Sequence, residues 1–400
     1  MSQTLLSARA SWPRKALPFV LVLLIFVLPS AGTAAIRSVL LAACLGLTLW
    51  IWVKERPTLP PYLWAFAVWA LAGVLSAVNA SNPGKVLAIA KSEVLYSALV
   101  YLSFYFAAAE TRFFSLLRRA VASSLAFFGL SAIIGTINAG GNWEPSFYNQ
   151  LGEYNTFVTL SLPLVLSAIL PGAIRAGSAM ERWLTAVAIV IAFGGCLFSS
   201  SRGIWINLSL VIVFLAVYAY RNHPRRIFLM GSLIVVIGCS ALWAAHMAST
   251  HRHLSLAQSN ARELIYRAAW EHIKEAPIFG HGYGRITSQE YYEAKFGGHI
   301  EHPHNVVLSY ADQAGVFGLA AIVALFWPFG SYFLRQVRTS TNPIFAVIGC
   351  VLLVSVFLRS MLDMFFYGQN LWLYWAYCGT LMALCRAQTQ TNSNASSAIT

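Results

Sequence analysis

Apolar runs of about 20 residues follow one another along most of this chain. A helix rises about 1.5 Å per residue, so a run of this length crosses the roughly 30 Å hydrocarbon core of a bilayer. Charged residues make up only 10% of the 400 residues, whereas soluble domains carry about 25%. The sequence therefore predicts an all-α, polytopic integral membrane protein.

The apolar runs predict about 12 membrane-spanning helices. The predicted spans are residues 16–34, 36–53, 60–78, 86–109, 114–138, 154–174, 181–199, 203–220, 227–247, 316–334, 343–365 and 369–386. The first run follows Arg9, Arg14 and Lys15 and lacks a small-residue cleavage site, so we expect it to remain as the first helix.

The longest polar stretch separates the ninth predicted span from the tenth. We divide the chain into transmembrane helices one to nine at 1–247, a loop with short helices at 248–315, helices ten to twelve at 316–387 and a tail at 388–400. The tail is polar and low in complexity, which predicts disorder. All histidines except His223 lie between His246 and His304, so the loop is where we expect the chemistry.

Most of the 27 Lys and Arg residues lie in the N-terminal segment, the C-terminal segment and alternate connections between spans. Cytoplasmic loops of membrane proteins are enriched in these residues. We therefore expect both termini on the cytoplasmic side and the loop 248–315 on the opposite side. The net charge of +13 has the same explanation, so nucleic acid is not a predicted partner.

Neither the cysteines nor the histidines show a convincing metal-binding pattern. The six cysteines lie in or at the edge of apolar runs, where they act as small apolar fillers. His251 and His253, and likewise His302 and His304, form His-x-His pairs, but no His-Glu-x-x-His motif or cysteine pair accompanies them. We expect neither a metal nor another cofactor, with a zinc site as the alternative.

Arg202 lies in a short connection between two apolar spans, at the boundary between membrane and water. An arginine in this position often extends to lipid phosphate without any catalytic role. It can equally bind an anionic substrate, because the guanidinium group holds phosphate oxygens with two parallel hydrogen bonds. The sequence alone leaves both interpretations open.

Residues 260–276 predict a helix that ends before Pro277, and its two arginines differ in their neighbours. Arg267 has Glu263 four residues before it and Glu271 four residues after it, so ion pairs along the helix are expected. Arg262 has no acid at these offsets and lies in the predicted first turn, where the helix dipole disfavours a cation. Arg262 is therefore a candidate for binding an external anion, and a solvated loop arginine is the alternative.

The sequence HPHN at 302–305 precedes a further predicted helix. Pro303 suits the first position of that helix, which places His304 in the first turn. There the helix dipole disfavours the imidazolium, so the pKa of His304 should fall and the neutral ring could act as a general base. A capping or packing histidine is the alternative. The glycines in GHGYG at 280–284 permit tight turns, and as a phosphate loop the segment is a weak match.

Three features together resemble the O-antigen ligase and polymerase family. They are Arg202-Gly203 at the start of a span, a loop with SNARELIYRAAWEHIKEAPIFGHGYG, and His304-Asn305 followed after nine residues by Gly315-x-x-Gly318. The resemblance covers roughly residues 150–335. It departs from the family pattern at Ala261, where members commonly have glycine before the loop arginine.

The resemblance implies a glycosyltransferase-C-like membrane enzyme at the periplasmic face of the Gram-negative inner membrane. Its donor would be a glycan on undecaprenyl pyrophosphate and its acceptor lipid A-core. By resemblance, Arg202 and Arg262 stabilise the leaving pyrophosphate without a metal, and His304 accepts the proton of the acceptor hydroxyl, with inversion at the anomeric carbon. Glu301 and Glu153 are rival bases. We expect substrate contacts from Arg267, Asn305, Asn155, Tyr266 and His302.

The same resemblance leaves two related reactions open, extension of O-antigen repeats and transfer to protein serines. The match at His304 and the short C-terminal segment favour the ligase. A transporter would need polar residues inside its spans, and only Glu93, Arg359 and Asp363 qualify. For the ligase, we expect Arg202, Arg262 and His304 to converge on one cavity at the membrane surface.

Overall fold

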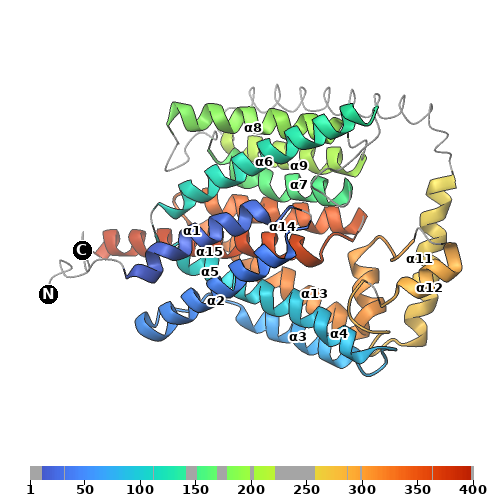
Figure 1. Cartoon of the computed structure of the whole chain (residues 1–400). Coiled ribbons are helices and arrows are strands. Elements are labelled where there is room, and N and C mark those ends of the chain that lie inside the picture. The colour runs from blue at the N-terminus through green and yellow to red at the C-terminus, as the bar shows by residue number, and fades with distance from the viewer. Residues whose placement is uncertain are drawn as a thin grey trace.

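The computed structural model describes residues 11–30, 32–110, 112–140, 151–168, 178–198, 202–220, 257–285, 287–297, 300–362 and 364–397. Within these ranges the chain is helical apart from turns and connections, and none of the described residues forms a strand (Figure 1). The all-α prediction is confirmed for this part of the chain.

The helices are α1 (Trp12–Val27), α2 (Ala34–Glu55), α3 (Leu63–Ser76), α4 (Pro83–Ala90), the π-helix η2 (Lys91–Leu95), α5 (Tyr96–Ala107), α6 (Phe113–Asn138), α7 (Leu151–Leu166), α8 (Ala179–Phe198), α9 (Arg202–Tyr220), α11 (Ala257–Glu275), α12 (Gln289–Phe296), α13 (Val306–Thr339), α14 (Ile344–Leu362) and α15 (Gly368–Ser397). The predicted span 227–247 lies outside the described residues. The span 86–109 covers the consecutive elements α4, η2 and α5, and each of the other predicted spans overlaps mainly one helix. Six helical segments of the described chain are long and apolar enough to cross a membrane. These findings support a helical membrane protein, and the count of twelve spans stays a prediction.

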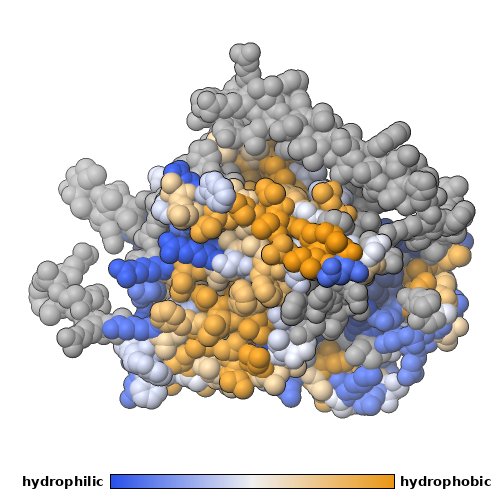
Figure 2. Space-filling model, turned by 45° about the horizontal axis from the view of Figure 1, so that its top comes forward, coloured by the Kyte–Doolittle hydropathy of each residue, from blue (hydrophilic) through white to orange (hydrophobic). Residues whose placement is uncertain are grey.

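Large apolar side chains remain exposed along the helices, as a lipid-facing surface requires. Trp12, Val39, Val190 and Trp327 are each at least two-thirds exposed. Figure 2 shows a broad hydrophobic surface across the middle of the molecule, with hydrophilic residues toward both sides. In Figure 1, α1 begins and α15 ends at the left, whereas α11 and α12 lie across the opposite end of the bundle. The start of α1 and the end of α15 thus lie at the opposite end of the described structure from α11 and α12.

Two element boundaries in the structure differ from those expected from the sequence. The tail predicted to be disordered from residue 388 continues α15 as far as Ser397. No proline or glycine interrupts it after Gly379, and Ala387 and Gln388 continue the helix from the last span. The helix predicted to start at Pro303 starts instead at Val306, because the Asn305 side chain caps it by accepting hydrogen bonds from Val307 N (3.0 Å) and Leu308 N (3.1 Å).

Helix α13 is broken inside its length, at the place where the sequence predicts the tenth span to begin. Ala314 and Gly315 leave the helical region, with φ/ψ of −137/16° and 58/−141°. At the break, backbone N–H and C=O groups lose their hydrogen-bond partners within the helix. Inside a helix bundle no water replaces these partners, and leaving such groups unpaired costs free energy.

The segment after α11 supplies the missing partners. His281 N donates to Asp312 O (3.0 Å), Gly282 N donates to Gln313 O (3.0 Å), and Val316 N donates to Pro277 O (2.9 Å). The GHGYG segment and the break in α13 therefore form one hydrogen-bonded unit, and this unit explains why both sequence motifs are rich in glycine.

Close backbone contact is the reason for glycine at two positions of this unit. A Cβ on Gly280 would lie 2.4 Å from Ala314 N, and a Cβ on Gly315 would lie 2.4 Å from the carbonyl oxygen of Ile278. Both residues also have positive φ, at 69° and 58°. Residues that carry a Cβ atom rarely adopt this backbone conformation.

Tyr283 carries this segment into the helix bundle. It is 1% exposed, and its hydroxyl donates to Glu93 Oε2 (2.6 Å) and accepts from Trp69 Nε1 (3.1 Å). Glu93 lies in η2 and Trp69 in α3, so one side chain of the polar segment joins two helices of the bundle. In addition, Tyr283 N donates a hydrogen bond to the Ser76 hydroxyl oxygen (2.8 Å).

Gly315→Ala should destabilise the protein, because the new methyl group overlaps backbone atoms and the residue has positive φ. We expect a loss of about 1–3 kcal/mol, measured as a lower melting temperature in detergent. Gly330→Ala is the matched control in the same helix, since its Cβ would meet side-chain carbons no nearer than 3.7 Å. Equal melting temperatures for the two variants would contradict the tight fit at the break.

Candidate active site

His304 lies in a short connection between α12 and α13 and has a left-handed backbone, with φ of 53°. It precedes the capping residue Asn305, so the expectation that it sits in the first turn of the helix was wrong. The proposed effect of the helix dipole on His304 loses its basis, because Asn305 caps the helix and stands between His304 and its first residue.

The neighbours of His304 are fixed on both sides. His302 is 5% exposed, and its ring lies 4.4 Å from the His304 ring, centroid to centroid, at 61°. Asn305 is 8% exposed and donates from Nδ2 to Met361 O at the end of α14 (3.4 Å). His302 and Asn305 thus place His304, which is half-buried, next to α14.

Arg285 reaches this connection from the segment after α11. Its Nη1 donates to the Tyr367 hydroxyl (2.6 Å), its Nη2 pairs with Glu301, and its guanidinium carbon lies 4.9 Å from the Tyr367 ring centre. Sequence reasoning missed Arg285, whose partners lie 16 and 82 residues away in the chain. Glu301, one of the rival bases, is the carboxylate in this ion pair.

Glu153, the other rival base, lies at the start of α7 and is also surrounded by partners. Gln369 Nε2 donates to Glu153 Oε2 (3.5 Å), and Gln369 Oε1 accepts from Arg37. Arg285 and Arg37 both act on Glu153 electrostatically. Burial raises the pKa of Glu153 above its usual value, and the two arginines offset only part of that shift, so Glu153 stays a rival base.

Helix α11 turns its two arginines toward different surroundings. Ile265 and Ala269 are buried against Tyr292, and Ile300 and Leu308 pack on the same cluster. Arg262 comes three residues before Ile265 and seven before Ala269, so it extends the face of α11 that meets the chain on either side of His304. Arg262 itself is exposed. Because α11 begins at Ala257, Arg262 lies in the second turn, and the expected position in the first turn was wrong.

Arg267 lies on the outward face of α11. Its Nη2 pairs with Glu263 at 2.6 Å, and the two side chains are 75% and 63% exposed. This predicted ion pair is confirmed, but Glu271 pairs instead with Lys274 (2.9 Å). Tyr266 and Arg267 line an open hollow of about 650 Å³ on this outward surface, together with Glu263, Trp270 and Glu271.

Arg202 is the first residue of α9, and its side chain lies outside the described part of the structure. The helix itself packs against α7 and α14. Asn207, in its second turn, donates from Nδ2 to Ser355 O of α14 (2.7 Å). Helix α14 is thus a common neighbour of α9, which begins with Arg202, and of the segment that carries His304.

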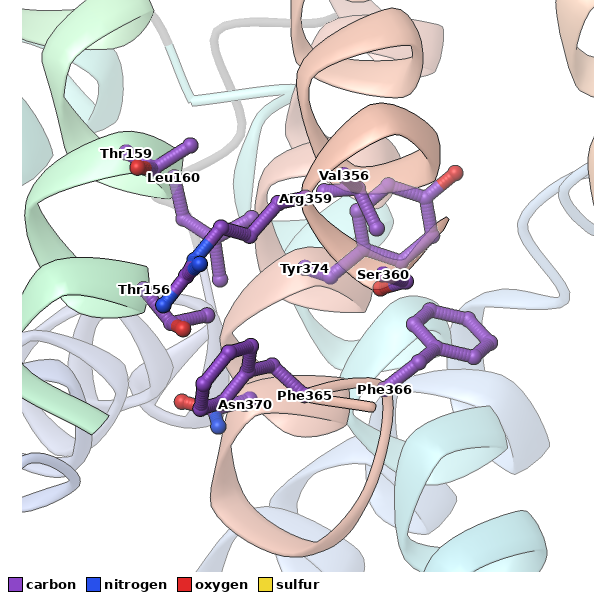
Figure 3. A pocket seen from close by; sticks show the side chains of 10 residues that line it. All are labelled: Thr156, Thr159, Leu160, Val356, Arg359, Ser360, Phe365, Phe366, Asn370 and Tyr374. Atoms are coloured by element: carbon purple, nitrogen blue, oxygen red, sulfur yellow. The ribbon is translucent and has the colours of Figure 1, made fainter. Parts of the chain in front are cut away.

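A small pocket lined by both polar and apolar side chains lies between α7, α14 and α15 (Figure 3). Arg359, Thr156 and Asn370 are among its lining residues, and its free volume of about 10 Å³ suits a single water molecule. Asn155, one residue before Thr156, is fully buried, and neither its amide nitrogen nor its amide oxygen has a partner within the described chain. Asn155 was predicted to contact substrate, and the structure places it inside the bundle.

Three side chains near α11 could bring ligand atoms to a metal ion: His272, Glu275 and His281, whose ligand atoms lie within 4.8 Å of one another. The two imidazole rings are stacked, 3.6 Å apart and 2° from parallel. Parallel rings direct their lone pairs side by side, whereas zinc needs ligands that converge from tetrahedral directions. The stacked arrangement therefore fits packing better than it fits a metal centre.

Hydrogen bonds hold the same stack against α13. His272 Nδ1 lies 2.7 Å from Asp312 Oδ1, and His281 Nε2 lies 2.8 Å from the His272 carbonyl oxygen. The Tyr292 hydroxyl donates to Asp312 Oδ2 (3.3 Å). Burial, together with this carboxylate, raises the pKa of Tyr292 well above its usual value, so the hydroxyl keeps its proton. The group fixes α11 and α12 on the first part of α13.

A family model described as O-antigen ligase matches residues 187–323 of this chain. The matched segment contains Arg202, Arg262, His304 and the break in α13. This match over about a third of the chain supports the O-antigen ligase family, as predicted from the sequence. The match accordingly supports a glycosyltransferase-like enzyme as the general class of this chain. No curated protein matches the chain significantly.

The two arginines of α11 should differ in function. Arg262→Ala should reduce glycan transfer by about 10²- to 10³-fold, the usual effect of losing one charge-stabilising donor. Arg267→Ala should leave most of the transfer and lower stability by about 0.3–0.5 kcal/mol, because it loses one exposed ion pair. Transfer rates and melting temperatures of the purified variants decide the matter. Inactivity of a well-folded Arg267→Ala protein, with Arg262→Ala active, would reverse the assignment.

Proposed function

We propose that the protein is an O-antigen ligase, which transfers a glycan from undecaprenyl pyrophosphate to a hydroxyl of lipid A-core. The reaction would take place at the periplasmic face of the bacterial inner membrane. The observation that carries this proposal is the packing of α11 on the chain beside His304: Ile265 and Ala269 meet Ile300 and Leu308, and Arg262 extends the same helix face.

In the proposed reaction, the acceptor oxygen attacks the anomeric carbon from the side opposite the pyrophosphate. The bond between that carbon and the phosphate oxygen breaks, its electron pair leaves with the pyrophosphate, and the configuration inverts. Arg202 and Arg262 neutralise the departing charge. His304 takes the proton from the acceptor hydroxyl.

Two features of the site support His304 as the base. Glu301 is engaged by Arg285, and Glu153 has Arg285 and Arg37 as electrostatic neighbours. The Glu301 carboxylate is thus already occupied in an ion pair, whereas burial raises the pKa of Glu153, which remains the rival base. His304 is half-buried at the end of the polar segment, where a hydroxyl from the aqueous side can approach it.

Purified protein in lipid vesicles should transfer a lipid-linked glycan to lipid A-core, and His304→Ala should lower this rate by about 10²- to 10⁴-fold. Binding of the donor should persist, because the arginines are unchanged. His223→Ala is the control, since His223 lies outside the polar segment. Full activity of His304→Ala would overturn the mechanism. Transfer only to a second lipid-linked glycan or to protein serines would identify the polymerase or the protein glycosylating enzyme.

Transfer should continue in EDTA, and added Mg²⁺ or Mn²⁺ should change the rate little, because two arginines replace a divalent ion at the pyrophosphate. The measurement is the initial rate before and after chelation. Loss of activity in EDTA with recovery on adding a metal, together with loss in His281→Ala, would identify the stack of His272 and His281 as a metal site.

A further inference from the structure

The backbone of His304 needs support from other residues. A left-handed φ of 53° is unfavourable for a residue with a Cβ, and such conformations persist only where neighbouring contacts hold them. On the C-terminal side the support is Asn305, which caps α13 and donates to Met361 O. On the N-terminal side the chain between Ile300 and His304 has no regular secondary structure, so side-chain contacts must hold it.

Glu301 provides the only charged side chain between Ile300 and His304, and its carboxylate pairs with Arg285. The pair is partly shielded from solvent: the Arg285 side chain is 18% exposed and the Glu301 side chain 35% exposed. Pairs shielded in this way are less screened than surface pairs. The pair is therefore a suitable tether for the segment that leads to His304.

Arg285 is itself fixed at both ends of its side chain. At the backbone end, the preceding residue Gly284 donates to Gln313 Oε1 at the break in α13 (3.1 Å). At the guanidinium end, Nη1 donates to the Tyr367 hydroxyl (2.6 Å) while the group lies over the Tyr367 ring. One planar guanidinium group thus binds two partners in fixed directions, which lysine cannot reproduce.

From this geometry we infer that Arg285 is a positioning residue for His304. It links Glu301, three residues before His304, to Tyr367 between α14 and α15, and to the break in α13 through Gly284. The inference rests on the proposed role of His304 as the base. Arg285 acts through Glu301 and touches neither the proposed leaving group nor the acceptor.

A positioning role has a kinetic consequence that a merely structural role lacks. Loss of Arg285 leaves Arg202 and Arg262 in place, so the KM for the lipid-linked donor should change less than threefold. Displacement of a base by about 1 Å can reduce a rate by about 10²-fold. Arg285→Ala should therefore lower kcat by about 10- to 100-fold, and Arg285→Lys should lie between Arg285→Ala and the unaltered protein.

The decisive experiment reverses the charges of the pair in the full-length protein in lipid vesicles. Arg285→Glu alone should be at least as impaired as Arg285→Ala, because it places two carboxylates together. Adding Glu301→Arg should raise kcat at least tenfold above Arg285→Glu. The matched control is the reversal of the exposed pair Glu271 and Lys274, which should leave kcat unchanged.

Wild-type kcat in Arg285→Ala, or a double reversal no faster than Arg285→Glu, would overturn the inference. If Arg285→Ala does not fold, Glu301→Gln removes the same charge pair from the other side. It should lower kcat at least fivefold with an unchanged donor KM, and wild-type kcat there would also overturn the inference. An active His304→Ala would instead refute the proposed function, so the two failures are distinguishable.

Discussion

The arrangement of the polar segment depends on the broken main chain of α13. At the break, the carbonyls of Asp312 and Gln313 accept hydrogen bonds from His281 and Gly282, and Val316 donates to Pro277. Backbone groups without partners are not tolerated inside an apolar bundle, so the helix and the segment after α11 require each other. Gly280 and Gly315 permit the backbone contact that these hydrogen bonds need.

These hydrogen bonds connect the segment after α11 to α13, so the chain from α11 to α13 forms a closed loop. Both of its ends meet at α13, and between them α12 packs on α11 through Tyr292 and Ile265. His304 lies at the end of this closed loop, beside the capping residue of α13. Tyr283 and Arg285 then attach the closed loop to the rest of the bundle, through Glu93 and Tyr367 respectively. The geometry around His304 is thus set by helices that are distant in sequence.

Local patterns in the sequence were sufficient for the helices and for the pair of Arg267 with Glu263, because apolar length and the spacing of four residues are local properties. They failed where two local signals compete. Pro303 and Asn305 both favour a helix start, and the asparagine prevails because its side chain satisfies two free amides. The contacts of Arg285 could not be predicted at all, since neither of its partners, Glu301 and Tyr367, follows from any helical or strand spacing.

The contact between Tyr283 and Glu93 also has a consequence for biosynthesis. The two residues are 190 positions apart in the chain. At about 5–20 residues per second, a ribosome adds Tyr283 roughly 10–40 s after Glu93. A carboxylic side chain is costly in a bilayer without a partner, so the early helices enter the membrane before the contact of Glu93 with Tyr283 has formed. Assembly of the N-terminal half is completed only when the polar segment has been translated and has docked.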